Sequence, residues 1–179
     1  MTPAMTTDPS TDPSPGCGYP ATLDAAGIRA RIPHQGRMAL LQALLDWSDS
    51  HIRCSLADHR AADHPLRQAG GLLSACAVEF AGQAMALHAA LRSDVAGARD
   101  VQGAAPGEPR AGFLASARGI TLHAPRLDDA PGPLVVRADR VAGDQRQAIY
   151  RFELHDADAR LLVEGRCTVV LDGTPATSP

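Results

Sequence analysis

The chain has 179 residues, a formal net charge of −3 at pH 7, 45% hydrophobic and 21% charged residues, which is ordinary for a globular protein. All 17 basic residues are arginine, which excludes chemistry that needs a lysine Schiff base or a lysine-bearing phosphate loop. The lack of a clustered basic run argues against nucleic acid as the main partner.

Both ends of the chain predict disorder. Residues 1–20 are acidic and rich in proline, serine and threonine, without the regions of a signal peptide, and we extend this tail to residue 27. Residues 172–179 predict a second tail, which leaves one domain over residues 28–171. The four cysteines form no CxxC pair, so no zinc site is expected, and their usage suits a reduced cytoplasm.

The first half of the domain gives mixed signals. Met38–Asp46 is apolar and leucine-rich, and its periodicity fits either a helix or a strand. His51–Ala57 alternates well enough to predict a strand after a turn. Asp58–Gly71 is polar and ends in two glycines, which predicts a loop.

The segment from residue 72 to residue 91 is alanine-rich and predicts one long buried helix. Glu79 is the only charged residue between Arg67 and Arg92. Because burying an ionised carboxylate without a partner costs several kcal/mol, its presence there indicates a function. The polar residues of this helix make insertion into a membrane unfavourable.

Four successive strands are expected in the second half, after a flexible connection over Ser93–Arg110. Their predicted bounds are Gly112–Ile120, Pro133–Val141, Gln147–His155 and Arg160–Leu171. One long helix with an antiparallel sheet wrapped around it is an α+β fold.

Four motifs follow one another along the chain: Ile32-Pro33-His34-Gln35, Asp63-His64-Pro65-Leu66, Glu79-Phe80-Ala81-Gly82-Gln83 and Gly112-Phe113-Leu114. In order and spacing they resemble the FabA/FabZ-type 3-hydroxyacyl-[acyl-carrier-protein] dehydratases, which have a single hot-dog domain with a sheet around one central helix. Residues 112–129 and 161–171 are most similar to the branch found in aryl-polyene and xanthomonadin-type pigment clusters.

The resemblance implies a role for two residues. His64 would be the general base that removes the proton at C2, and Glu79 the acid that protonates the departing hydroxyl at C3, each from a different subunit of a dimer. From the residues alone, burial would keep a proton available on Glu79. Two plainer interpretations stay open: His64 could be a loop histidine that binds nothing, and Glu79 could pair with a strand arginine such as Arg118.

Further residues are expected to bind substrate. Gly71 is the candidate whose backbone N–H polarises the thioester carbonyl, because a helix start attracts negative charge. Gln83, one turn after Glu79, could bind that carboxylate, the substrate or core carbonyls. An acyl chain needs an apolar tunnel, along which we place four residues that could equally be core: Leu72, Phe80, Met85 and Phe113.

The other histidines predict less. Two Asp-His dipeptides, ending at His59 and His64, match no metal-ligand signature, so neither a metal nor another cofactor is expected. His34 is expected to fix a turn, and His88 to be a hydrogen-bonded core histidine.

The expected function is dehydration of 3-hydroxyacyl chains to trans-2-enoyl thioesters in fatty-acid or polyene biosynthesis. The expected partners are an acyl carrier protein with a phosphopantetheine-linked chain, and a second subunit that makes a homodimer or a heterodimer with another hot-dog protein. Two alternatives are a hot-dog acyl thioesterase, which His64 disfavours, and a non-catalytic subunit of a heterodimeric dehydratase. The sequence leaves open the acyl length and the choice between carrier protein and coenzyme A.

Overall fold

The computed structural model describes residues 21–95, 112–144 and 146–171. The predicted tails over residues 1–20 and 172–179, and most of the predicted connection before the second half, lie outside these residues. The helical elements are α1 (Ala25–Arg29), α2 (Ala77–Val95) and two short 3-10 turns, η1 (Gly36–Met38) and η2 (Ser74–Cys76). The strands are β1 (Leu23–Asp24), β2 (Leu41–Trp47), β3 (His51–Leu56), β4 (Gly112–Leu122), β5 (Val135–Gly143), β6 (Gln147–His155) and β7 (Leu161–Leu171).

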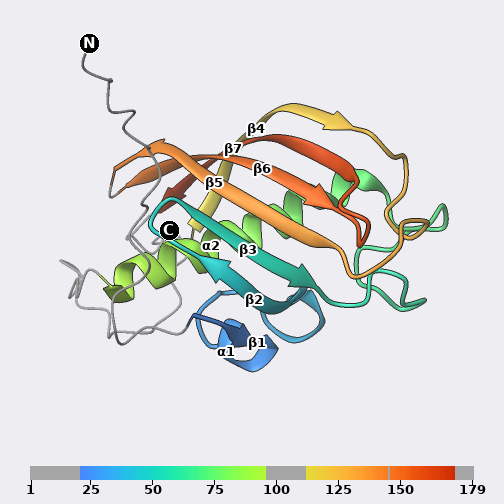
Figure 1. Cartoon of the computed structure of the whole chain (residues 1–179), viewed down its shortest axis with the longest axis horizontal. Helices are drawn as coiled ribbons and strands as arrows, with labels where there is room; N and C mark the ends of the chain where they lie inside the picture. Colours follow the sequence, from blue (N-terminus) through green and yellow to red (C-terminus); the bar gives the residue numbers. More distant parts are fainter. Residues whose placement is uncertain (1–20, 96–111, 145, 172–179) are drawn as a thin grey trace, which may run out of the picture.

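The strands form one antiparallel sheet in the order β1-β2-β3-β5-β6-β7-β4. Figure 1 shows α2 lying across one face of this sheet, where it contacts β2 through β7. The predicted α+β layout, a sheet around one long helix, is therefore confirmed. The strand β4 is an edge strand whose neighbour in the sheet is β7.

The helix α2 is held in place by its small and apolar residues. Its buried positions recur at helical spacing, and the alanines among them let the helix approach the sheet closely. The observed helix differs at both ends from the helix predicted over residues 72–91. It begins later, at Ala77, and continues further, to Val95. At the start, Leu73 forms a β-bridge with Arg126 instead, and this long-range pairing holds the chain extended.

The predicted strands agree closely with the observed ones. β6 has the predicted bounds, since its strict alternation buries one face and exposes the other. The ambiguous segment Met38–Asp46 is a short 3-10 turn followed by β2.

The folded part of the chain begins before residue 28, the predicted boundary. β1 pairs with β2, and the side chain of Asp24 caps α1 by accepting a hydrogen bond from the Gly27 backbone N–H at 2.8 Å. Ile28 and Ile32 are completely buried against the core, so this segment closes one side of it. None of the helices in the described residues is long and apolar enough to cross a membrane.

Candidate functional site

Glu79 lies in the first turn of α2, and its side chain is 37% exposed. Its Oε1 atom accepts a hydrogen bond from Nε2 of Gln83 at 2.8 Å and lies 3.4 Å from Nε2 of His34. The carboxylate is therefore not withdrawn from solvent within one chain, contrary to the expectation of a desolvated group. Its ion-pair partner in the described residues is His34, and not Arg118 on β4.

Gln83 connects Glu79 to the segment that leads into β2. Its amide is completely buried; Oε1 accepts from the Leu40 backbone N–H at 2.9 Å, and Nε2 donates to the Met38 carbonyl at 2.8 Å. Since Nε2 also donates to Glu79, both amide hydrogens have protein acceptors. From the sequence, Gln83 was expected to bind Glu79, the substrate or core carbonyls. The structure shows hydrogen bonds with Glu79 and with the main chain.

His34 is a neighbour of Glu79 that sequence reasoning missed. It lies just before η1, and its Nδ1 atom is buried without a hydrogen-bond partner in the described residues. The sequence suggested only a turn-forming role. The sequence does contain the Pro33-His34 motif and the helix glutamine Gln83. Because Gln83 binds the segment that follows this motif, the two together could have indicated that His34 lies near Glu79.

His64 lies in the loop between β3 and η2 and is only 7% exposed. Its ring contacts the ring of Phe80 edge-on, with centroids 6.1 Å apart. Nδ1 of His64 accepts a hydrogen bond from the Leu66 backbone N–H at 3.2 Å, so the neutral ring carries its proton on Nε2. Burial lowers the pKa of His64 below its usual 6.5, and nearby His59 and Arg67 act in the same direction.

The two predicted catalytic residues are not joined within one chain. His64 packs on Phe80, whereas Glu79 faces Gln83 and His34. In the described part of the chain, no hydrogen bond or ion pair links His64 with Glu79.

Gly71 forms a tight turn with Gln68 just before η2. Its backbone N–H donates to the Gln68 carbonyl at 2.9 Å, so the N–H expected to polarise a thioester is already bound. Gly71 has a φ of +102°, and a Cβ atom there would collide with the guanidinium of Arg126. At the helix start, the hydroxyl of Ser74 is completely buried without a hydrogen-bond partner in the described residues.

The expected tunnel residues fall into two groups. Leu72, Phe80 and Met85 are buried in the core. Phe113, in contrast, is 59% exposed on the edge strand β4. Within a single chain these four residues therefore do not line one common channel.

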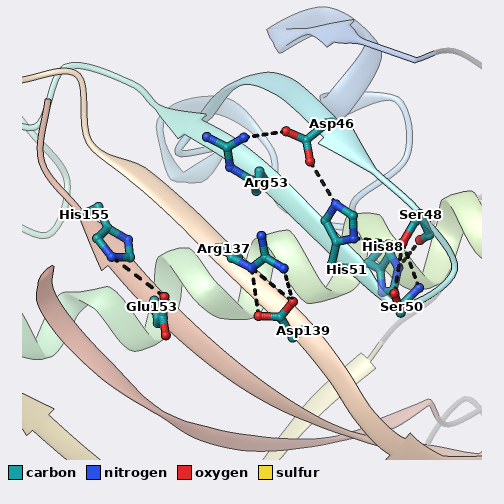
Figure 2. Close-up of polar contacts among 10 residues, drawn as sticks. All are labelled: Asp46, Ser48, Ser50, His51, Arg53, His88, Arg137, Asp139, Glu153 and His155. Atoms are coloured by element: carbon teal, nitrogen blue, oxygen red, sulfur yellow. Dashed lines mark hydrogen bonds and ion pairs between the residues drawn. The ribbon is translucent and has the colours of Figure 1, made fainter. Parts of the chain in front are cut away.

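Figure 2 shows a polar network at the turn between β2 and β3, in which Ser48 contacts both His88 and His51. His88 is a hydrogen-bonded core histidine, as predicted: Nε2 donates to the Ser48 carbonyl at 2.8 Å, and Nδ1 accepts from the Tyr150 hydroxyl at 2.9 Å. Ser48, His51 and Asp46 contact one another in series, with distances of 2.8 and 2.9 Å.

This Ser48–His51–Asp46 series has the residue types of a hydrolase triad, but it closes the β2–β3 hairpin. Ser48 is only 6% exposed, and its hydroxyl also accepts the Ser50 backbone N–H. Among the described residues, no three histidine, cysteine, aspartate or glutamate side chains lie together in a way that could hold a metal ion.

The model of one sequence family, ApeP-like, described as ApeP dehydratase, matches residues 26–176. The chain belongs to the ApeP-like dehydratase family. This family match confirms the resemblance to the aryl-polyene branch of hot-dog dehydratases that the sequence motifs indicated. The enzyme class is hydro-lyase. No curated protein sequence is significantly similar to the chain.

Two solved structures show the same fold. One is a chain of the dehydratase heterocomplex ApeI:P from Xenorhabdus doucetiae, with a TM-score of 0.68 and 20% identity, covering 85% of this chain and 93% of that one. The other is AziG from S. sahachiroi, with a TM-score of 0.50 and 20% identity, covering 73% of this chain and 90% of that one. These likenesses establish the hot-dog fold.

Proposed function

We propose that this ApeP-like dehydratase removes water from 3-hydroxyacyl chains carried on the phosphopantetheine of an acyl carrier protein, and that the product is a trans-2-enoyl thioester used in polyene biosynthesis. The observation that carries the proposal is the arrangement of Glu79, whose two carboxylate oxygens have different surroundings. Oε1 accepts a hydrogen bond from Gln83 and lies 3.4 Å from Nε2 of His34, whereas no hydrogen bond or ion pair joins Oε2 to the described residues.

Glu79 is the proposed acid. Because Oε1 accepts a hydrogen bond from Gln83, the proton of the carboxylic acid belongs on Oε2. The partial exposure of the side chain leaves Oε2 within reach of a substrate. From there the proton passes to the hydroxyl at C3, which leaves as water.

His64 is the proposed base. Its lowered pKa keeps the ring neutral at pH 7, as a base requires. To accept the C2 proton on Nε2, the ring must first carry its own proton on Nδ1, so the contact with the Leu66 N–H must break when substrate binds. The electrons of the C2–H bond then form the C2–C3 double bond as the C3–O bond breaks, and the proton gained by His64 is later returned to Glu79.

The edge strand β4 supports a second subunit. Leu114 and Leu122 are half-exposed on this eleven-residue strand, beside the exposed Phe113. Long edge strands with exposed apolar side chains are normally covered, since they otherwise promote aggregation. We infer that a second hot-dog subunit pairs along β4, which brings His64 of one subunit and Glu79 of the other to one site. The ApeI:P dehydratase heterocomplex, one chain of which shares this fold, makes a heterodimer the first arrangement to test.

Mass spectrometry of a 3-hydroxyacyl-carrier protein tests the proposal. The full chain is incubated with it, alone and with a second hot-dog subunit, next to the His64→Ala variant. Loss of one water with the wild type and not with the variant is the expected result. Loss of the whole acyl group would identify a thioesterase, and an unchanged substrate in both mixtures would contradict the dehydratase proposal.

A further inference from the structure

Two side-chain nitrogen atoms from different parts of the chain lie near the same oxygen of Glu79. Gln83 approaches Oε1 from the next turn of α2, and Nε2 of His34 approaches it from the turn before β2. Gln83 also binds Met38 and Leu40, just after His34, so the helix turn that carries Glu79 fixes the segment that carries His34. The three side chains thus form one connected unit.

The surroundings of His34 suggest more than a turn-forming role. If Nε2 of a neutral ring directs its hydrogen toward Glu79, Nδ1 is left as an acceptor, and this atom is buried without a donor in the described residues. A buried polar atom without a partner is costly and rare in folded proteins. In addition, a partly exposed contact between a histidine and a carboxylate contributes little to stability, so stability does not explain why histidine occupies this position.

We propose that His34 is a positioning residue for Glu79. Together with Gln83 it holds Oε1, so that Oε2 remains the only carboxylate oxygen that exchanges a proton with the substrate. This inference rests on the proposed function, because it assigns His34 a task in the same reaction. The separation of 3.4 Å is long for a hydrogen bond, and contacts of this kind commonly shorten when substrate binds.

The kinetic test compares three variants with the wild type in the dehydration assay. His34→Ala removes the donor, and His34→Gln keeps an N–H group at nearly the same distance from the backbone. His155→Ala is the matched control, because His155 and Glu153 also form a partly exposed His-carboxylate pair, at 3.7 Å, on β6.

For His34→Ala we expect kcat to fall roughly 10- to 100-fold while KM changes less than about 3-fold, because orientation of the acid matters in the transition state. His34→Gln should recover most of the loss, and His155→Ala should retain the wild-type kcat. Similar thermal midpoints for all variants will show that the fold is intact. A wild-type kcat in His34→Ala, or no recovery in a folded His34→Gln, would overturn the proposal.

The contact itself is tested without activity by NMR of the ¹⁵N-labelled histidine rings. Glu79→Gln should shift the His34 ring signals and leave those of His155 unchanged, whereas Glu153→Gln should do the reverse. Unchanged His34 signals would overturn the positioning role even in an active dehydratase. If the wild-type protein forms no enoyl product, the proposed function is wrong. The task assigned to His34 is then wrong as well, whatever the spectra show.

Discussion

The side-chain amide of Gln83 donates a hydrogen bond to Oε1 of Glu79 at 2.8 Å, one turn away on the same side of α2. The same buried amide binds the main chain on both sides of Ala39, in the segment between η1 and β2. The orientation of the proposed acid is therefore tied directly to the packing of the helix against the sheet. A change at Gln83 should affect both stability and activity.

Gln83→Met keeps the size of the side chain and removes its hydrogen bonds. The free energy of unfolding should fall by roughly 2–4 kcal/mol, because the Leu40 N–H and the Met38 carbonyl lose their partner. Urea denaturation measures this change. The control is Gln42→Met on the exposed side of β2, which should alter stability by less than about 0.5 kcal/mol. Equal effects at the two positions would contradict the structural role of Gln83.

Gly71→Ala tests the turn before the helix. Its φ of +102° disfavours any side chain, and Arg126 cannot easily move away because it binds both oxygens of Asp128, at 3.1 and 2.6 Å, and lowers the pKa of Asp128 to about 2. We expect a loss of about 1–3 kcal/mol in thermal or urea unfolding. Gly70→Ala is the matched control, since a Cβ atom there meets nothing within 4 Å. A larger loss of stability for Gly70→Ala than for Gly71→Ala would show that the Gly71 turn is not strained by a side chain.

His88 should make stability depend on pH. Burial lowers the pKa of His88 from 6.5 to about 4. Between pH 4 and pH 6.5, His88 therefore binds a proton in the unfolded chain but not in the folded chain. Its contribution to stability is therefore complete above pH 6.5 and is lost as the pH falls toward 4. The loss between pH 7 and pH 5 should be roughly 2 kcal/mol.

The control for this prediction is His88→Gln, which keeps an N–H donor near the Ser48 carbonyl but does not titrate. Its unfolding free energy should decrease about 2 kcal/mol less than that of the wild type between the same two pH values. Parallel decreases would show that another group is responsible.

Leu122→Asp tests the inferred subunit contact on β4. A carboxylate in a packed interface should weaken the assembly at least ~100-fold, because the charge would be buried without a partner. Sedimentation velocity of the full chain, alone or with its second hot-dog subunit, measures the change. Val141→Asp serves for comparison, since Val141 on β5 is exposed to a similar extent, 47% against 49%. If both variants assemble like the wild type, β4 is not the contact.

Most of the fold follows from short-range patterns in the sequence. The alternation in β6 and the helical spacing of apolar residues in α2 depend only on local period, so both elements were predictable. Leu72 and Leu73 are apolar enough for a helix, but their pairing with the distant Arg126 and Leu127 keeps them extended. Such competition from tertiary contacts has no signal in the local sequence.

The candidate site was predictable in part. The isolated charge of Glu79 made it stand out, and Gln83 followed from the spacing of one helical turn. The nearness of His34 depends on how the chain before β2 packs against α2, which local patterns do not contain. The exposure of Phe113 likewise depends on β4 being an edge strand of the single chain.

Transfer of a proton through Oε2 of Glu79 is best tested by the rate of dehydration with the Glu79→Gln variant. The substitution keeps the shape of the side chain and removes the acid. We expect kcat for a 3-hydroxyacyl-carrier protein to fall at least ~100-fold, with the variant still folded. If the variant eliminates water at the wild-type rate, Glu79 is not the acid.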